Sequence, residues 1–380
     1  MSVNDLKPSR DQQPKVLFVL GGMGMGGAER VAATLLNGWL ERGLPASLLT
    51  LGETDASAYN LAPEVEHHNV NLLWASANPV SGVWANMRRI RMVRDAITNI
   101  APHVVISFIE ANNVLVLAAL RQLDIPVIVS ERTDPRHYKV VWWRRLMRRL
   151  LYPRSSALVV PTEAVATWSR RWMPAHKVEV IVNPLPDFPS PDMEAPREHL
   201  ILSVGRLVWH KGHRDLIDAY VGSHAQQRDW KLVVLGEGPE RRNLEAQIDR
   251  LNLQEHVSLP GNTPSPWQWL HRAAIFVLPS SFEGFSNALM EGLAMGCACV
   301  AYNCPSGPAE LLADDRGVLV PTGDVDALRV ALDELVDDEA RRLQLAHNGF
   351  QGSERYDFDR VTGQWLQLIH RVLAAQQHET

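Results

Sequence analysis

Short apolar runs recur along the whole chain and constrain its fold more than any other feature of the sequence. Each run is rich in Val, Ile and Leu and is followed by a longer stretch with the periodicity of an amphipathic helix. Apolar runs separated by helical segments are typical of parallel strands that are buried on both faces. The sequence therefore predicts an α/β protein with two Rossmann-like domains that face a cleft.

The predicted strands divide into two sets. Those of the first half are Lys15–Leu20, Ala46–Leu51, Val104–Phe108, Pro126–Ser130 and Ala157–Val160. Those of the second half are Leu200–Val204, Lys231–Leu235, Val257–Leu259, Ile275–Leu278, Cys299–Ala301 and Gly317–Val320.

The two sets are separated by residues 183–199, a stretch crowded with prolines. Proline fixes φ and lacks an amide donor, so this stretch is interpreted as a stiff connector. We therefore predict a first domain over residues 14–183, a linker over 184–199 and a second domain over 200–358. The last helix, residues 359–376, is expected to return to the first domain.

The two halves differ in charge. Lys and Arg outnumber Asp and Glu by 21 to 15 in residues 1–185, whereas Asp and Glu outnumber Lys and Arg by 28 to 17 in residues 186–380. A basic first half indicates an anionic partner such as a phosphate or an acidic membrane; the alternative is an asymmetry without function. Residues 1–14 do not have the pattern of a secretory signal, and no apolar run approaches the ~18 residues of a membrane span. We therefore expect a protein that is cytoplasmic or attached to a membrane surface.

A glycine-rich loop follows the first predicted strand and leads into a helix near Ala28. Glycines let the backbone turn sharply beside a ligand, and a helix N-terminus favours negative charge. Gly22, Gly24 and Gly27 have the spacing of a dinucleotide-binding loop, but the acidic residue that such proteins need after the second strand comes late, at Glu53. We interpret the loop as facing the interdomain cleft, with a plain strand-to-helix turn as the alternative.

Two cations follow the first predicted strand of the second half. After Gly205, Arg206 and Lys211 flank a turn that leads into a helix. Cations at the carboxyl edge of a parallel sheet are well placed to neutralise a diphosphate. As exposed side chains they would contribute little to folding. The turn Gly236–Pro239, after the next strand, is predicted to be structural and to lie along the same edge.

The most specific pattern is SSFEGFSNALMEGLAMG, in which Glu283 and Glu291 stand eight residues apart around a predicted helix start. Glu283 is expected in the loop and Glu291 about two turns inside the helix. The backbone amides of Phe285, Ser286 and Asn287 are then first-turn donors for a phosphate. A carboxylate inside the helix can accept hydrogen bonds from two ribose hydroxyls. The alternative, an acidic helix start that only stabilises the helix dipole, does not account for the whole combination.

A basic amphipathic helix is predicted over Val140–Leu151. Arg144, Arg145, Arg148 and Arg149 fill an arc of roughly 140° at the ~100° per residue of an α-helix, and apolar residues fill the rest. Such a helix can lie on an anionic membrane or grip the diphosphate of an acceptor. The alternative is a surface helix whose apolar side packs on the domain core.

No metal site is predicted. Cys297, Cys299 and Cys304 lie close together without a histidine among them and are interpreted as buried apolar residues. Asp-x-Asp pairs begin at Asp324 and Asp357; the first is interpreted as a helix cap, and the second lies beyond the predicted sheet.

Taken together, the Glu283-x7-Glu291 pattern, the turn from Gly205 to Lys211 and the loop Gly26-Gly27-Ala28-Glu29 resemble the GT-B retaining glycosyltransferases of family 4. The resemblance covers the chain from Lys15 to the last helix. The run Cys-Pro-Ser-Gly-Pro at residues 304–308 is similar to the bacterial branch that builds surface polysaccharides and lipid-linked oligosaccharides.

The resemblance implies a nucleotide-sugar-binding second domain and an acceptor-binding first domain. Arg206 and Lys211, beside Gly205, would bind the donor diphosphate. Glu291 would hold the ribose, and Glu283 would contact the transferred sugar.

The resemblance also implies contacts from backbone groups. The amides of residues 285–287 would bind the sugar hydroxyls or the phosphate, and Gly26 and Gly27 would pack against the donor. Many members have a histidine after the strand that here reads VVISF, but this chain has Glu110 and Asn112 in that region. Glu110 could orient the acceptor or act as a base, or Asn112 could donate a hydrogen bond to the sugar.

The implied reaction moves a hexosyl group from a nucleotide diphosphate sugar, with uridine preferred, to a hydroxyl of a glycan or lipid-linked oligosaccharide. The anomeric configuration would be retained, with no metal, no cofactor and no nucleic acid. The enzyme would lie at the cytoplasmic face of the membrane. Two alternatives stay open: an NAD-dependent oxidoreductase built on the glycine loop, and a non-catalytic homologue that binds a nucleotide sugar or a glycan.

Overall fold

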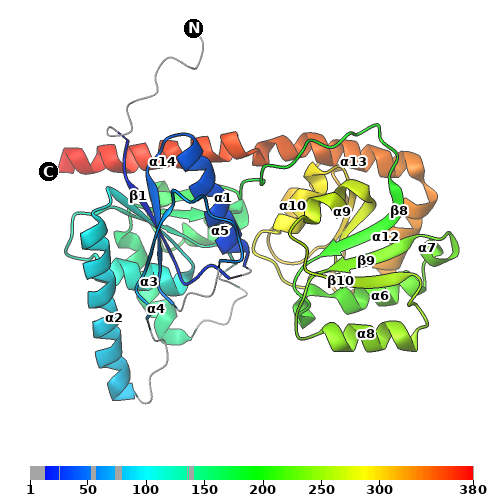
Figure 1. The fold of residues 1–380 in the computed structure, drawn as a ribbon, viewed down its shortest axis with the longest axis horizontal. Coiled ribbons are helices and arrows are strands. Elements are labelled where there is room, and N and C mark those ends of the chain that lie inside the picture. Colours follow the sequence, from blue (N-terminus) through cyan, green and yellow to red (C-terminus); the bar gives the residue numbers. More distant parts are fainter. Residues whose placement is uncertain are drawn as a thin grey trace, which may run out of the picture. The chain divides into compact units, whose positions relative to one another are not determined.

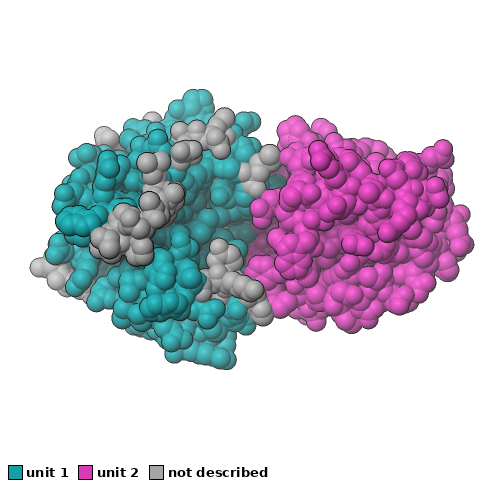
Figure 2. All heavy atoms as spheres, turned by 90° about the horizontal axis from the view of Figure 1, so that it is seen from below, with its two compact units in different colours: residues 1–184, 359–380 teal, residues 185–358 magenta. Residues whose placement is uncertain are grey.

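The chain folds into two compact units, shown in Figures 1 and 2. Unit 1 comprises Met1–Pro184 and Asp359–Thr380, and unit 2 comprises Leu185–Phe358. The structure is a computed structural model, and it describes residues 13–24, 26–52, 57–72, 79–134, 136 and 141–379. Glu53 and Val140 lie outside these residues.

Unit 1 is built on a seven-stranded sheet in which all neighbouring strands are parallel. The strands, in their order across the sheet, are β3 (Glu66–Asn69), β2 (Ala46–Thr50), β1 (Val16–Leu20), β4 (Val104–Phe108), β5 (Val127–Ser130), β6 (Ala157–Val160) and β7 (Val178–Val180). The α-helices of this unit are α1 (Gly27–Glu41), α2 (Pro79–Ile100), α3 (Glu110–Ala119), α4 (Trp142–Leu151), α5 (Glu163–Ser169) and α14 (Phe358–Glu379). No helix among the described residues is long and apolar enough to cross a membrane.

The two edge strands of this sheet were not predicted from the sequence. β3 reads EHHN and is mostly exposed, and β7 has three residues. Edge strands are often short and polar because one side pairs with no neighbour, so they lack the apolar run that identifies a central strand.

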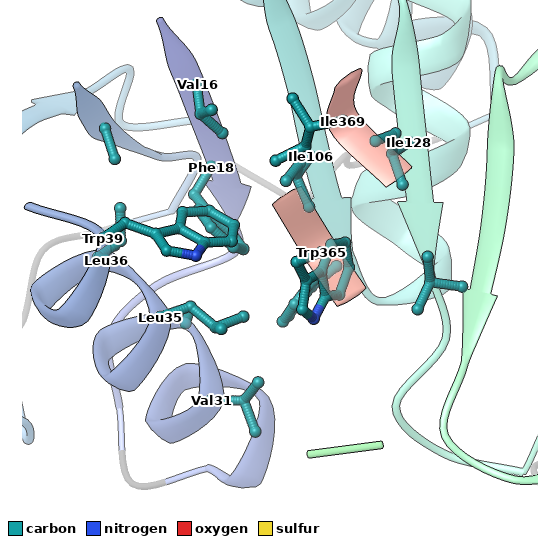
Figure 3. Close-up of a cluster of buried hydrophobic side chains, with 14 of the residues drawn as sticks. Val16, Phe18, Val31, Leu35, Leu36, Trp39, Ile106, Ile128, Trp365 and Ile369 are labelled. Atoms are coloured by element: carbon teal, nitrogen blue, oxygen red, sulfur yellow. The ribbon is translucent and has the colours of Figure 1, made fainter. Parts of the chain in front are cut away.

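The C-terminal helix α14 completes the core of unit 1. Trp365 and Ile369 are fully buried, and in Figure 3 their side chains point into the same cluster as Phe18, Ile106 and Trp39. The ring centroids of Trp39 and Trp365 lie 6.4 Å apart at 72°, an edge-to-face arrangement that aromatic pairs favour. The last segment of the chain is therefore part of the first hydrophobic core.

Unit 2 is built on a six-stranded sheet that is also parallel throughout. The strands, in their order across the sheet, are β10 (Val257–Gly261), β9 (Lys231–Leu235), β8 (Glu198–Val204), β11 (Ala273–Leu278), β12 (Ala298–Tyr302) and β13 (Val318–Val320). The α-helices are α6 (His213–Val221), α7 (His224–Gln227), α8 (Arg241–Arg250), α9 (Pro266–Arg272), α10 (Asn287–Ala294), α11 (Pro308–Leu311), α12 (Val325–Asp337) and α13 (Glu339–Ser353).

The proline-rich stretch packs on unit 2. The amide of Leu185 donates to the carbonyl of Tyr356, and the guanidinium of Arg197 donates to the carbonyls of Leu270, His271 and Met295. Strand β8 begins at Glu198, two residues before the predicted start. Hydrogen bonds to residues far away in the sequence fix this stretch to unit 2. The composition of the stretch does not reveal these bonds.

In each sheet the order of the strands reverses at one strand. β1 lies between β2 and β4, and β8 lies between β9 and β11. In an open α/β sheet the loops on either side of such a reversal diverge, and ligands bind outside the carboxyl ends of those strands. The fold thus brings the loops after β1 and β4 together in unit 1, and those after β8 and β11 together in unit 2.

The packing of α14 predicts a specific loss of stability. Trp365→Ala should lower the free energy of unfolding of unit 1 by about 3–5 kcal/mol, because removal of a fully buried indole leaves a cavity. Urea unfolding followed by circular dichroism measures this loss. Trp84→Ala is the matched control, since this indole is 70% exposed on α2, and it should change stability by less than about 0.5 kcal/mol. Equal losses in both variants would contradict the packing role of α14.

Candidate functional site

The turn after β8 positions Arg206 and Lys211. Arg206 is exposed, and Lys211 ends a short 3-10 helix, η4 (Trp209–Lys211). Gly212 follows with φ of 67°, and a Cβ at this residue would come within 1.9 Å of the carbonyl oxygen of Pro279 at the end of β11. Only glycine allows both this φ and this close approach. The chain can therefore bring Lys211 directly beside the loop after β11.

The turn at Gly236–Pro239 packs against the backbone around Arg206. Gly236 has φ of 147°, and a Cβ there would lie 1.9 Å from the carbonyl oxygen of Gly205. The amide of Leu207 donates to the carbonyl of Glu237 over 2.8 Å. This turn was predicted to be structural, and the contacts indicate what it holds: the backbone on either side of Arg206.

Lys211 forms a largely buried ion pair with Glu283. Lys211 Nζ donates to Glu283 Oε1 over 2.6 Å, and the two side chains are 19% and 9% exposed. The expectation of an exposed Lys211 is therefore wrong. The sequence did not show this pairing because the partners are 72 residues apart and meet only through the packing of two loops.

The helix after Glu283 begins two residues later than the predicted start at Phe285. α10 begins at Asn287, and Ser286 is its N-cap, whose hydroxyl accepts a hydrogen bond from the amide of Leu289 over 3.3 Å. Phe285 therefore lies outside the first turn. Glu291 is the fifth residue of α10, a little more than one turn inside rather than two, and it is 1% exposed. A serine N-cap fixes the start of the helix and hence the direction of Glu291.

Two residues near this pair were missed by the sequence analysis. The hydroxyl of Ser306 lies within hydrogen-bond distance of the carbonyl oxygens of Glu283 (3.3 Å) and Gly284 (3.1 Å) and so fixes the loop that carries Glu283. His213, the first residue of α6, is buried beside Gly205, and burial, together with the charge of Lys211, lowers its pKa to about 4. Its imidazole is thus neutral at pH 7. The runs CPSGP and HKGH contained both residues, but only long-range contacts give them their positions.

In unit 1 the glycine loop and the start of α3 lie together. Gly26 is the N-cap of α1, and a Cβ there would overlap the carboxylate of Glu29. Gly27 is the first residue of α1, one position earlier than expected. A Cβ on Gly21 would lie 3.6 Å from the amide group of Asn112 on α3. The two segments that the sequence analysis assigned to a ligand are therefore neighbours.

Glu110 occupies a strained strand-to-helix junction. Ile109, between β4 and α3, has φ of 75°, a conformation that is unfavourable for a β-branched residue. Glu110 follows as the first residue of α3 and is 6% exposed, and its Oε1 has no hydrogen-bond partner among the described residues. Burial raises the pKa of Glu110, and the charges of Arg144 and Arg148 oppose this rise. Asn112, by contrast, donates to the carbonyl of Phe108 over 2.9 Å.

The basic helix α4 does not bury its apolar side, as the core-packing alternative would require. Its apolar residues Trp142, Leu146 and Leu150 are 76%, 47% and 49% exposed, whereas Arg148 is 4% exposed. A helical wheel gives the separation of two faces but not which face is buried. The four arginines of the predicted arc do not share one exposed face, because Arg148 is buried.

A surface pocket of about 530 Å³ adjoins this helix. Four arginines and two tryptophans contribute to its lining: Arg136, Arg145, Arg148, Arg149, Trp142 and Trp168. Arg136 is paired with the buried Asp134. The pocket thus combines positive charge with aromatic surface, a combination that suits an anionic ligand with an apolar part.

The Asp-x-Asp pairs and the three cysteines, for which a metal site was considered, have structural roles. Asp324 is the N-cap of α12 and accepts a hydrogen bond from the amide of Ala327 over 2.9 Å, as predicted. Asp359 pairs with Arg42. The three cysteines are buried free thiols around β12, also as predicted, and burial beside Glu283 raises the pKa of Cys304 to about 12. Within the described residues, no group of three or more His, Cys, Asp or Glu could hold a metal ion.

Comparison with known protein families gives a match in each half of the chain. Residues 25–186 match the family described as Glycosyltransferase Family 4. Residues 191–352 match the family described as Glycosyl transferases group 1.

Two curated relatives from Campylobacter jejuni are similar along nearly their whole length. One is named GalNAc-alpha-(1->4)-GalNAc-alpha-(1->3)-diNAcBac-PP-undecaprenol alpha-1,4-N-acetyl-D-galactosaminyltransferase; it is 27% identical over 94% of this chain and 99% of its own. The other is named N-acetylgalactosamine-N,N'-diacetylbacillosaminyl-diphospho-undecaprenol 4-alpha-N-acetylgalactosaminyltransferase; it is 30% identical over 91% of this chain and 96% of its own.

A solved structure shares the fold. The crystal structure of Anabaena Alr3699/HepE in complex with UDP has a TM-score of 0.75 and 18% sequence identity, and the match covers 93% of this chain and 98% of the other.

The Lys211–Glu283 pair predicts coupled effects on stability. Lys211→Met should lower the free energy of unfolding of unit 2 by about 2 kcal/mol, because it leaves the Glu283 carboxylate buried without its cation. The double variant Lys211→Met/Glu283→Gln should recover most of this loss. Thermal and urea unfolding of the single and double variants give the coupling energy. Additive losses would show that the two side chains have no interaction energy with each other in the folded protein.

Proposed function

The chain belongs to the glycosyltransferases of group 1 and family 4 and is a hexosyltransferase, and from this premise we propose that it takes its sugar from a nucleotide diphosphate donor and retains the anomeric configuration. The acceptor is a hydroxyl of a glycan or lipid-linked oligosaccharide. Membership also removes the oxidoreductase alternative, since an oxidoreductase does not account for the family matches. A non-catalytic homologue would match the same families, and the named transferase relatives favour an active enzyme over it.

The observation that carries this proposal is the Lys211–Glu283 pair at the carboxyl edge of the second sheet. When the donor binds, Lys211 can share its charge between Glu283 and the diphosphate, and the exposed Arg206 supplies a second cation. These cations favour departure of the diphosphate as its negative charge grows. The Glu283 carboxylate lies beside them and suits the positive charge that develops on the sugar.

The geometry of α10 supports the remaining donor contacts of this proposal. Glu291 is directed by the Ser286 cap and is assigned to the ribose hydroxyls. The amides at the start of α10, around Ser286 and Asn287, are assigned to the sugar or the phosphate. Gly26 and Gly27 keep a role in donor contact as a prediction from the resemblance.

On the acceptor side, Glu110 is a better candidate than Asn112. The amide of Asn112 is bound to its own helix start, whereas Glu110 has a buried oxygen without a partner among the described residues. A raised pKa brings a carboxylate closer to the value that suits a general base near neutral pH. Glu110 would accept the proton of the acceptor hydroxyl while the new bond forms on the face that the diphosphate leaves.

The class of acceptor is inferred from the relatives. The names of both Campylobacter jejuni proteins include sugars that are linked to undecaprenol through a diphosphate. We assign the same class here, with the pocket beside α4 for the acceptor diphosphate or the helix itself for the membrane surface. Uridine is preferred as the donor nucleotide on the strength of the branch resemblance. The enzyme would then work at the cytoplasmic face of a membrane.

The donor assignment predicts slow hydrolysis of one nucleotide sugar. Incubation with a panel of UDP- and GDP-sugars should release nucleotide from a UDP-hexose or UDP-N-acetylhexosamine, and Glu283→Gln should abolish this release. The release should survive EDTA, because Arg206 and Lys211 supply the positive charge that the leaving diphosphate needs. Chromatography of the released nucleotide measures the rate. Loss with EDTA and recovery with manganese would contradict the proposed role of the two cations.

The membrane assignment predicts reversible binding to acidic liposomes. Arg144→Gln/Arg145→Gln/Arg149→Gln should weaken binding by about 3 kcal/mol, roughly a factor of 100, since each arginine near anionic lipid contributes ~1 kcal/mol. Arg148 is omitted because it is buried. Liposome co-sedimentation at low and high salt measures the effect.

A matched control and an alternative outcome separate the two roles of α4. Arg214→Gln/Arg242→Gln/Arg250→Gln removes the same charge from exposed positions of unit 2 and should leave liposome binding unchanged. If the α4 triple variant binds liposomes normally but has a raised KM for a lipid-linked acceptor, the arginines bind the acceptor diphosphate. If neither property changes, both assignments of the helix are wrong.

A further inference from the structure

A second group of buried charges lies in unit 1, beside the carboxyl ends of β4 and β5. Glu131 directly follows β5 and is 4% exposed. The hydroxyl of Tyr152 donates to Glu131 Oε1 over 2.5 Å and accepts a hydrogen bond from Asn113 Nδ2 over 3.0 Å. Asn113 Nδ2 also contacts the carbonyl oxygen of Ser130 at 3.0 Å. These bonds fix the Glu131 carboxyl to both β5 and α3.

The guanidinium of Arg148 interacts electrostatically with two carboxyls of this group. Arg148 comes from α4, which packs against α3, and its charge acts on both Glu110 and Glu131. Its Nε and Nη1 atoms are buried and have no hydrogen-bond partner among the described residues. The guanidinium lies over the rings of Trp168 and Trp172, at 5.1 and 5.7 Å. The rings attract the cation but leave its N–H donors unsatisfied, and buried donors of this kind need an acceptor.

We propose that Glu110, Glu131 and Arg148 form one charge cluster, in which Glu131 is a positioning residue whose charge sets how strongly Arg148 binds a phosphate of the acceptor. This inference rests on the proposed assignment of the α4 pocket to an anionic acceptor. Arg148 is the member of the cluster that also lines that pocket. Glu131 acts on the ligand only through it.

The proton affinity of Glu131 makes its charge adjustable near neutral pH. Burial raises the pKa of Glu131 to about 7; the hydrogen bond from Tyr152 and the charge of Arg148 lower it, and the charge of Glu110 raises it. These groups face Glu131 from the 3-10 turn η2 (Tyr152–Arg154), from α4 and from α3. Below pH 7 Glu131 is mostly protonated and adds no charge to the cluster. Above pH 7 the cluster gains a negative charge that opposes an incoming anion.

The binding of inorganic pyrophosphate tests this proposal. The protein is first saturated with UDP, so that the Arg206–Lys211 turn is occupied, and pyrophosphate is then titrated by calorimetry at pH 6 and pH 8. Pyrophosphate itself gains charge over this range, so the quantity to compare is the ratio of the Kd of the parent protein to that of Glu131→Gln. We expect a ratio near one at pH 6 and about fivefold higher at pH 8, as for an added unit charge in a partly buried site.

Two further variants test in which direction the pH at which pyrophosphate binding weakens is shifted. Tyr152→Phe removes a hydrogen bond that favours the ionised carboxylate, so the pH at which pyrophosphate binding weakens should rise. Glu110→Gln removes a neighbouring negative charge, so this pH should fall. Glu64→Gln, an exposed change of the same charge in unit 1, should leave the profile of the parent protein unchanged.

Thermal unfolding gives a readout that does not depend on any ligand. Because the pKa of Glu131 is higher in the folded protein than in the unfolded chain, this group destabilises the fold increasingly as pH rises from its unfolded value towards 7. Glu131→Gln keeps an acceptor for Tyr152 but carries no charge. Its melting temperature relative to the parent protein should therefore be higher at pH 8 than at pH 5.

The outcomes separate this inference from the proposed function. Pyrophosphate binding with the same Kd ratio at both pH values would overturn the role of Glu131 and leave the anion pocket intact. Absence of pyrophosphate binding in the UDP-bound protein would overturn the cluster as an anion site. Neither result bears on release of nucleotide from the donor, which tests the glycosyltransferase site of unit 2 by itself.

Discussion

Close contact between backbone segments at the carboxyl edge of the second sheet determines where the charges of unit 2 can lie. A Cβ on Gly212 would meet the carbonyl of Pro279, and a Cβ on Gly236 would meet the carbonyl of Gly205. Both glycines also have positive φ, so no other residue satisfies the conformation and the contact together. With these two approaches in place, Lys211 reaches Glu283, and the charge pair becomes a consequence of the main-chain packing.

The charged groups at the carboxyl edges of the two sheets are balanced in different ways. In unit 2 one cation meets one carboxylate, and the neutral His213 beside them adds no charge at pH 7. In unit 1 the charge of Arg148 acts on two carboxyls, and burial raises the pKa of one of them, Glu131, to about 7. A balanced pair suits a site that must receive a doubly charged leaving group, because the cation can change partners. An unbalanced cluster suits a site whose affinity follows its protonation.

Local patterns in the sequence were enough for the central strands and for the loops that follow them. Apolar runs identify strands buried on both faces, and the edge strand β3, which reads EHHN, has no such run. Glu283 and Glu291 could be predicted as site residues because their spacing is local to one loop and one helix. Ser306, His213 and the partner of Lys211 were not found, because each depends on a contact between loops that are far apart in the sequence. Tertiary packing, which residue spacing does not encode, supplies that information.

The helix α4 shows how such packing can reverse the usual interpretation of an amphipathic pattern. Burial of an arginine is unfavourable unless its charge and its donors are compensated. Here Trp168 and Trp172 cover the Arg148 guanidinium, and the charges of Glu110 and Glu131 offset part of the cost of burying its charge. This one arginine therefore faces inward, although two of its nitrogens have no hydrogen-bond partner among the described residues. The apolar stripe of Trp142, Leu146 and Leu150 is then left exposed, beside the basic Arg145 and Arg149. The buried Arg148 and the exposed Trp142 and Leu146 line the same pocket. On the proposed assignment of this pocket to the acceptor, the acceptor site and the surface that would meet a membrane therefore adjoin on one helix.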